Sequence, residues 1–345
     1  MKRLKVLITA IVFLIQACNS GKDHVVEPAE QVPATFIASV KEKYPTATAV
    51  KFSVLEENKV YQANFKMSGT AVSVVSNNQE FLTTARVAGE SFHDSLQVKL
   101  AGLAIAGGVS SNYRIVEIPG QPQRHVTDYL LNGVNYTLSI NTNGYVQMAT
   151  RQLSYETKSL NDLPEAIQKF VNDRNKPNPA YVASLQLEEQ LKPHLLDKNE
   201  LTYKSGSVFL TTNGTKRYHV MVSYYGMTDL PLLFDEHANL IWVSNFNRVE
   251  SFTNFDSLTG GLTKISDSDL SHFKNLFNSG AEFQNFALGN PVSNTRASLN
   301  VYGGLTSYEF LLIKQQSNGT ANESWNLCFD SNKNLISSTY FGQTN

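Results

Sequence analysis

The chain has little cysteine and a net charge close to zero, and both features exclude some classes of function. Two of the 345 residues are cysteine, Cys18 and Cys328, so disulfides cannot be its main source of stability. The 29 basic and 30 acidic residues nearly cancel, giving a net charge of −1. A chain without a basic excess is poorly suited to nucleic acid, and we expect no nucleic-acid partner.

The sequence motifs of common enzymes are also missing. There is no Gly-x-Ser-x-Gly, no glycine-rich phosphate loop and no Cys-x-x-Cys. The seven histidines are scattered without His-x-His or His-Glu-x-x-His spacing, so we expect no zinc site. Cys328 lies in an apolar stretch without a basic neighbour, which predicts a buried, inert thiol. We therefore predict no catalytic residue, no cofactor and no metal.

The N-terminus carries a targeting signal. A basic start, Lys2–Lys5, precedes the apolar run Val6–Ile15, which is shorter than the roughly 20 residues that a membrane-spanning helix needs. Ile15-Gln16-Ala17-Cys18 resembles the lipobox of bacterial lipoproteins, in which the cysteine is acylated after cleavage. The resemblance implies a signal peptide over residues 1–17 and lipid attachment at Cys18. An ordinary signal peptide cleaved nearby is the alternative.

The next segment, residues 18–31, is polar and lacks apolar periodicity, so we expect a flexible tether. Asn19 is not the aspartate that resembles an inner-membrane retention signal, which favours the outer membrane. Lys22-Asp23 is similar to the surface-export signals of Bacteroidetes lipoproteins. We therefore expect a membrane attachment through the N-terminal lipid, either on the periplasmic face or on the cell surface.

One hairpin-like segment occurs twice. Phe234–Ile241 matches Phe329–Ile336 at the Phe, Asp, Asn, Leu and Ile positions. A polar turn between apolar strand ends predicts a β-hairpin. Asp330, Asn332 and Asn334 also resemble the start of a calcium loop, but the glycine and the bidentate glutamate of such a loop are missing. We expect instead a turn in which these side chains bond to their own backbone.

The same order of elements recurs before each turn, and repetition of this kind indicates stacked copies of one unit. Apolar spacing predicts helices at Phe36–Tyr44, Leu96–Leu103, Asp162–Val171 and Ser266–Phe277. Strands are expected at Val50–Val54, Tyr113–Ile118, Tyr181–Leu187 and Phe283–Leu288, with additional strands at Lys204–Thr212 and Thr295–Tyr302.

This order predicts an α+β fold of tandem units, each with one helix packed on a four-stranded antiparallel sheet. The expected units span residues 32–90, 91–155, 158–249 and 265–345, with a linker at 250–264.

The first unit resembles a PepSY-like unit. The resemblance rests on Val32-Pro33-Ala34, on Lys43–Ala47, on Val50-Lys51-Phe52 and on Tyr61–Phe65. PepSY-like units share a fold with the β-lactamase inhibitory protein (BLIP), and the two Phe-Asp hairpins resemble the turn that closes such units. The resemblance implies a tandem-repeat lipoprotein of the Bacteroidetes type that binds or inhibits and has no catalytic residues.

Aromatic residues concentrate in the expected strands, where most must be core. An antiparallel sheet with one helix-covered face leaves its other face free to present some of them, but alternation does not say which. The residues considered are Tyr129, Tyr136, Tyr218, Tyr224, Tyr225, Tyr308 and Phe310.

We expect the protein to bind an envelope or secreted protein through this sheet face, with inhibition as one form of that binding. A glycan-binding surface lipoprotein is the first alternative, and an enzyme with a deep pocket is the second. Asp256-Ser257-Leu258, in the expected linker, resembles the O-glycosylation motif of Bacteroidetes. Asp94-Ser95-Leu96 resembles it too, but it also fits a helix start.

Overall fold

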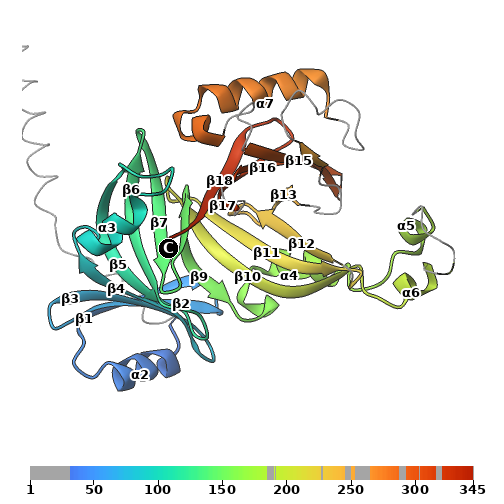
Figure 1. Ribbon diagram of the computed structural model, residues 1–345. Helices are drawn as coiled ribbons and strands as arrows, with labels where there is room; N and C mark the ends of the chain where they lie inside the picture. The colour runs from blue at the N-terminus through green and yellow to red at the C-terminus, as the bar shows by residue number, and fades with distance from the viewer. Residues whose placement is uncertain are drawn as a thin grey trace, which may run out of the picture.

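The computed structural model describes residues 32–184, 190, 192–226, 228–244, 250–252, 265–286, 293–302, 304–315 and 321–344. Strands hold 51% of the residues and helices 20%, so β-structure dominates (Figure 1). Every strand pair in the described residues is antiparallel. The expectation of a mixed, largely antiparallel fold is therefore confirmed.

The chain begins with a helix and a four-strand meander. Helix α2 (Ala34–Lys43) buries Phe36 and Val40, which lie four residues apart on one face. Four strands follow in order: β1 (Thr48–Glu56), β2 (Val60–Met67), β3 (Thr70–Asn77) and β4 (Phe81–Gly89). Two-residue turns such as Ser68-Gly69, both at positive φ, suit the twist of a hairpin.

The next segment repeats this order with a shorter helix. Helix α3 (Asp94–Leu100) buries Leu96 and Leu100. Its four strands are β5 (Val109–Glu117), β6 (Arg124–Leu131), β7 (Val134–Asn141) and β8 (Tyr145–Ala149).

The middle of the chain forms a second sheet. Strand β9 (Arg151–Thr157) leads through a 3-10 helix (Leu160–Asp162) into α4 (Glu165–Asn172), which buries Ile167 and Val171. Two short helices and four strands follow: α5 (Pro179–Ser184), α6 (Lys192–Leu196), β10 (Leu201–Thr211), β11 (Lys216–Tyr224), β12 (Thr228–Phe234) and β13 (Leu240–Val243).

The C-terminal part begins with the short strand β14 (Glu250–Phe252). Helix α7 (Asp267–Ser279) is capped by Ser266, whose Oγ accepts a hydrogen bond from the Asp269 N–H at 3.2 Å. The remaining elements are a 3-10 helix (Ala281–Phe286), β15 (Ser293–Tyr302), β16 (Leu305–Gln315), β17 (Ala321–Phe329) and β18 (Leu335–Gln343).

The strands form two sheets. The larger has 13 strands in the order β1-β2-β3-β4-β5-β6-β7-β8-β18-β17-β16-β15-β14, and the smaller has five in the order β13-β12-β11-β10-β9. The last strand, β18, pairs with β8, which joins segments nearly 200 residues apart, since Phe341 lies opposite Gln147. The first, second and fourth groups of strands thus share one sheet rather than forming separate four-stranded sheets.

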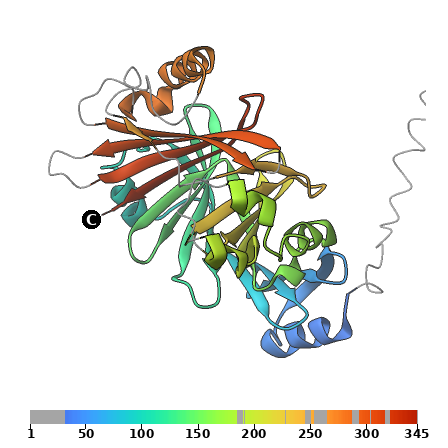
Figure 2. The ribbon, with the colours of Figure 1, turned by 90° about the vertical axis from the view of Figure 1, so that its right-hand side faces the viewer.

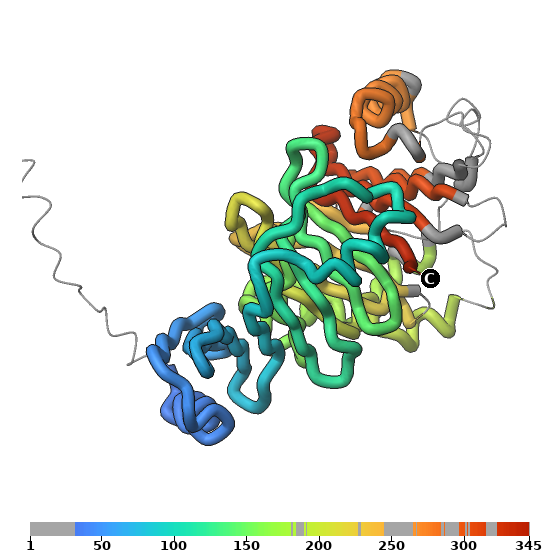
Figure 3. Tube along the Cα trace, turned by 60° about the vertical axis from the view of Figure 1, so that its left-hand side comes forward, coloured from blue at the N-terminus to red at the C-terminus, as the bar shows by residue number. Residues whose placement is uncertain are grey.

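Helices cover one face of each sheet. Helix α2 and helix α7 lie at opposite ends of the molecule (Figure 3), and β15–β18 run side by side beneath α7 (Figure 2). Helices α3 and α7 contribute to one apolar core, which includes Leu96, Phe273 and Trp325. Helix α4 packs on the smaller sheet through Ile167 and Val171.

Two expected strands are wrong. Pro179–Ser184 is helical, with Val182 buried beside Leu195 and Tyr225, so the strand expected at Tyr181–Leu187 does not form where the structure describes it. Ala281–Phe286 is a 3-10 helix in place of the strand expected at Phe283–Leu288. Phe283 and Phe286 lie three residues apart, and this spacing lets a 3-10 helix bury both on one side.

The two additional strands expected from the sequence form, and several other expectations lie outside the described residues. The strands expected at Lys204–Thr212 and Thr295–Tyr302 are β10 and β15. Residues 250–252 of the expected linker pair with β15 as β14. The signal peptide, the tether, Cys18 and Asp256-Ser257-Leu258 lie outside the described residues.

Candidate functional site

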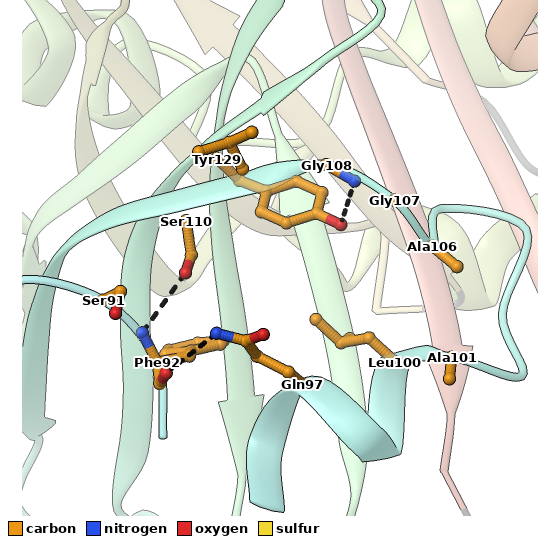
Figure 4. A pocket seen from close by; sticks show the side chains of 11 residues that line it. Ser91, Phe92, Gln97, Leu100, Ala101, Ala106, Gly107, Gly108, Ser110 and Tyr129 are labelled. Atoms are coloured by element: carbon orange, nitrogen blue, oxygen red, sulfur yellow. Dashed lines mark hydrogen bonds between the residues drawn. The ribbon is translucent and has the colours of Figure 1, made fainter. Parts of the chain in front are cut away.

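A pocket of about 550 Å³ lies between α3 and strands β5 and β6 (Figure 4). Its polar groups already bond to one another. The Tyr129 hydroxyl donates to the Ile105 carbonyl at 2.8 Å and accepts from the Gly108 N–H at 2.9 Å, while Gln97 Nε2 donates to the Phe92 carbonyl. A Cβ at Gly108 would lie 2.3 Å from the Tyr129 ring, so glycine is needed there. The pocket holds a loop in place and offers few free donors to a ligand.

A second cleft, of about 530 Å³, separates the β2–β3 strands from the 3-10 helix Leu160–Asp162. Amide side chains and Lys59 line this cleft, and several of these polar groups already bond to other parts of the chain. Asn77 Nδ2 donates to Asp162 Oδ1 at 3.1 Å, and Lys59 Nζ donates to the Leu163 carbonyl at 2.7 Å. These bonds attach the first meander to the segment before α4.

The face of the larger sheet opposite its helices provides a different kind of surface, and the smaller sheet covers part of it. Paired residues point to the same side of an antiparallel sheet, so the strand register defines a row across seven strands. At about 4.8 Å between strands this row spans roughly 29 Å. Its members, which we call the free-face row, are Arg114, Val126, Ser139, Gln147, Phe341, Ser324 and Ile313.

Two exposed aromatic rings stand on this face. Phe341 is 43% exposed, and Tyr145, two residues from Gln147 on β8, is 56% exposed. Residues two apart on a strand share a face, so both rings flank Gln147. They come from segments far apart in the sequence and meet only because β8 pairs with β18. Exposed aromatic rings are frequent anchors of protein interfaces.

A cleft of about 240 Å³ lies beside these rings, between the two sheets. Its larger-sheet wall comes from β5–β8 and its smaller-sheet wall from β9 and β10. The lining residues are Val116, Arg124, Val126, Thr137, Ser139, Gln147, Ala149, Arg151, Gln152, Leu153, Glu156, Ser207 and Phe209. We call it the inter-sheet cleft.

One side of the inter-sheet cleft holds a closed polar network. Arg124 Nη2 lies 3.5 Å from Glu156 Oε1 and also donates to Gln121 Oε1. Gln121 Nε2 donates in turn to Glu156 Oε2. Each charge in this network therefore has an opposite charge or an amide as its partner.

Arg151, on β9, lacks such a partner. Its guanidinium lies over the Phe209 ring, 4.3 Å from the ring centroid, and its Nε is buried without a hydrogen-bond partner. Burial lowers the pKa of Arg151 from its ordinary value. Burial together with the Arg151 charge lowers the pKa of the neighbouring His219 to about 3, so this imidazole is neutral at pH 7.

Farther along the gap between the two sheets, side-chain hydrogen bonds join the sheets directly. Glu309 accepts hydrogen bonds from Ser244 Oγ and, at 2.9 Å, from Asn326 Nδ2. Burial raises the pKa of this carboxyl, and the two hydrogen bonds only partly oppose that effect. Burial likewise raises the pKa of Cys328, which confirms the buried thiol expected from the sequence.

The strand aromatics considered from the sequence face the cores instead. Tyr129, Tyr136, Tyr218, Tyr225, Tyr308 and Phe310 are buried, and Tyr224 is half-buried. The exposed pair has its own signal in the sequence. Val146 and Met148 alternate toward the core, which places Tyr145 on the other face, and the neighbours Tyr340 and Phe341 must point to opposite faces.

The two Phe-Asp turns have equivalent geometry. Asp330 Oδ1 accepts from the N–H groups of Asn332 and Asn334, both at 2.9 Å. Asp235 Oδ1 accepts from His237 and Asn239 in the same way, at 3.0 and 2.8 Å. The expected backbone-bonded turn is confirmed. In the described part of the chain, no group of three or more His, Cys, Asp or Glu side chains is placed to hold a metal ion.

Comparisons with known proteins add a partial likeness. No protein-family model and no curated protein matches the chain. Three solved structures from Bacteroides each align with 32% of this chain. A DUF2874 family protein from Bacteroides uniformis is 21% identical, with 82% of it covered and a TM-score of 0.29. A BLIP-like protein from Bacteroides fragilis is 21% identical, with 79% covered and a TM-score of 0.28.

The third, described as a putative periplasmic protein from Bacteroides eggerthii, is 19% identical, with 81% covered and a TM-score of 0.29. No helix in the described ranges is long and apolar enough to cross a bilayer. The chain is thus similar, across 32% of its length, to DUF2874 family and BLIP-like proteins of Bacteroides, as the sequence predicted.

Proposed function

We propose that the protein is a non-enzymatic cell-envelope lipoprotein that binds another envelope or secreted protein on the exposed part of this face of its larger sheet. The observation that carries this proposal is the exposed pair Tyr145 and Phe341, which flank Gln147 on the free-face row.

The test compares variants of this face. The double variant Tyr145→Ala/Phe341→Ala removes both rings, and Val98→Ala is the matched control because Val98 is 73% exposed on α3. Partners are captured by cross-linking in envelope extract and identified by mass spectrometry. Since interface aromatics are worth about 2 kcal/mol or more, we expect the double variant to lose at least tenfold in capture. The control should retain it.

Two results would contradict the proposal. One is equal capture by the double variant and the unchanged protein. The other is binding to sugars on a glycan array without any protein cross-link, which would favour the glycan-binding alternative instead.

We also infer that the chain is built of tandem units with the boundaries expected from the sequence, residues 32–90, 91–155, 158–249 and 265–345. The order of elements supports this inference, because α2, α3, α4 and α7 each precede a run of four strands. The strand β9 is shared between neighbours, since it lies in the second span but pairs with β10 of the third.

The anchor is proposed to be a lipid on Cys18 in the outer membrane. Replacing the cysteine, Cys18→Ala, removes the only thiol of the lipobox-like tetrapeptide. We expect the variant to lose the mass of its acyl chains and to leave the membrane fraction, because stable anchoring needs two or more chains. Intact-mass measurement of protein made in a lipoprotein-processing host checks this. An unchanged mass would refute lipidation at this residue.

A further inference from the structure

The inter-sheet cleft contains a positive charge that no carboxylate of the described residues neutralises. Arg151 has no ion pair and no hydrogen bond within the described chain, and its guanidinium lies over the face of the Phe209 ring. An arginine stays protonated at neutral pH even where burial disfavours its charge. The Arg151 side chain is half-buried with its Nε enclosed, and proteins normally pair a charge in such a place.

The carboxylates near the cleft are already engaged. Glu156 pairs with Arg124 and accepts from Gln121. Glu309 accepts from Ser244 and Asn326. The charged lining residues are Arg124, Arg151 and Glu156, so the lining carries one net positive charge.

A second arginine, Arg217, lies on the same sheet face but is not among the residues that line the cleft, so the lining keeps one net positive charge. Arg217 lies opposite Phe209 in the strand register and therefore shares the face of the smaller sheet that carries Arg151. Its Nε is also buried without a hydrogen-bond partner. The neighbouring His219 is neutral at pH 7, so it adds no charge.

The opposite wall offers uncommitted hydrogen-bond donors. Thr137, Ser139 and Gln147 line the cleft from β7 and β8, and Ser139 lies directly opposite Gln147. The side chains of these three residues make no hydrogen bond within the described chain. Two hydroxyls and one amide thus face the same small volume as the Arg151 guanidinium.

We propose that the inter-sheet cleft binds a carboxylate, whose oxygens accept hydrogen bonds from Arg151 and from the hydroxyls of Thr137 and Ser139. A planar guanidinium matches a carboxylate in geometry. The volume of about 240 Å³ is below the 300–1,000 Å³ typical of drug-sized ligands and suits a short acid or a single acidic side chain. One net positive charge matches a monoanion better than a phosphate dianion. This inference goes beyond the proposed protein-binding role and does not depend on it.

The test is isothermal titration calorimetry of the full chain at pH 7 and constant ionic strength. The carboxylate probes are sodium acetate, as a free short acid, and N-acetylglutamate amide, as a model of an acidic side chain. Sodium phosphate and sodium chloride serve as non-carboxylate anions. We expect saturable binding of a carboxylate probe that is at least tenfold tighter than that of phosphate or chloride. Tighter binding of acetate would indicate that the cleft takes a free short acid, and tighter binding of N-acetylglutamate amide would indicate an acidic side chain of a docked protein.

Variants assign the binding to this cleft. Arg151→Gln should abolish it, with Lys66→Gln as the matched control because Lys66 is an exposed cation on β2. Thr137→Val/Ser139→Ala should weaken binding by about a hundredfold, since each of the two hydrogen bonds to a charged group is worth about tenfold in affinity. Thr70→Val, at an exposed hydroxyl of β3, is the control for this pair.

If circular dichroism shows that Arg151→Gln fails to fold, the test relies on the Thr137→Val/Ser139→Ala variant alone. Three outcomes would overturn the proposal: no saturable carboxylate binding, phosphate binding as tight as that of the carboxylates, or unchanged affinity in the Thr137→Val/Ser139→Ala variant.

Discussion

At the scale of single residues, the two aspartates Asp235 and Asp330 organise turns through bonds to their own backbone. Each carboxylate accepts two N–H groups at Oδ1 and a side-chain amide at Oδ2. Partial burial raises the pKa of Asp235, but hydrogen bonds from Asn239 and His237 outweigh it and hold the pKa below its ordinary value. Such turns depend on residues within one short segment, which is why the sequence could predict them.

Asp269 links three elements and gives the first prediction at this scale. Its carboxylate lies 2.5 Å from Lys333 Nζ and accepts from the Tyr308 hydroxyl at 3.1 Å. The hydrogen bond from Lys333 is the main cause that lowers the pKa of Asp269, against the opposing effect of burial. We expect Asp269→Asn to reduce the free energy of unfolding at pH 7 by about 1.5–3 kcal/mol, as for hydrogen bonds to charged groups.

The pH dependence of this loss has a definite sign. A carboxyl whose pKa is lower in the folded state stabilises fully above the unfolded pKa of about 3.9, and the contribution is lost as the pH falls through the folded pKa. The difference between wild type and Asp269→Asn should therefore persist at pH 5 and shrink below about pH 4. Urea unfolding at each pH measures it, with the exposed Asp197→Asn as control. A difference that does not depend on pH would contradict the assignment.

At the scale of elements, α7 is held on its sheet by one aromatic cluster. The Phe273 ring lies 4.6 to 5.1 Å from the ring centroids of Phe310, Phe329 and Tyr308. We expect Phe273→Ala to lower the free energy of unfolding by about 3–5 kcal/mol, because it leaves a cavity among these rings. The control Ser271→Ala, on the exposed side of the same helix, should stay within about 0.5 kcal/mol. Chemical denaturation compares them, and equal stability of both variants would show that α7 contributes little to the core.

The elements also show where sequence analysis works and where it fails. Helices with strong apolar spacing and hairpins with Asn-Gly or Asp turns, such as Asn132-Gly133, were predictable because their causes are local. The segments at Tyr181 and Phe283 were short and ambiguous. Phe283 packs against Trp325 with ring centroids 5.4 Å apart, and only the folded neighbour decides that this segment turns instead of extending.

At the scale of the whole molecule, the candidate surfaces depend on pairings that no local pattern encodes. Phe341 meets Gln147 because β18 pairs with β8. Arg151 faces the larger sheet because the chain crosses from one sheet to the other at Thr150, between β8 and β9. The sequence could show that a sheet face would be free, but the residues on it follow from long-range register.

The two sheets are joined closely enough to unfold as one. Trp242 Nε1 on the smaller sheet donates to the Tyr308 carbonyl at 3.3 Å, and Ser307 Oγ donates to the Val243 carbonyl at 2.7 Å. Loss of either sheet would break these bonds, each worth about 0.5–1.5 kcal/mol net, and would expose the buried Trp242 side chain to water. This coupling favours a single cooperative transition.

The two tryptophans of the chain test that coupling, because each sheet holds one. Trp242 lies on β13 of the smaller sheet and Trp325 on β17 of the larger, and both are buried, so unfolding should shift the fluorescence of each.

Trp325→Phe leaves a probe of the smaller sheet and Trp242→Phe a probe of the larger. Within each variant, we expect the fluorescence midpoint in urea to coincide with the midpoint from circular dichroism, as a two-state transition requires. Comparing probes within one variant removes the effect of the substitution itself on stability. A fluorescence midpoint that differs from the circular dichroism midpoint would mean that the sheets unfold separately, and the inter-sheet cleft would then be able to open while both sheets remain folded.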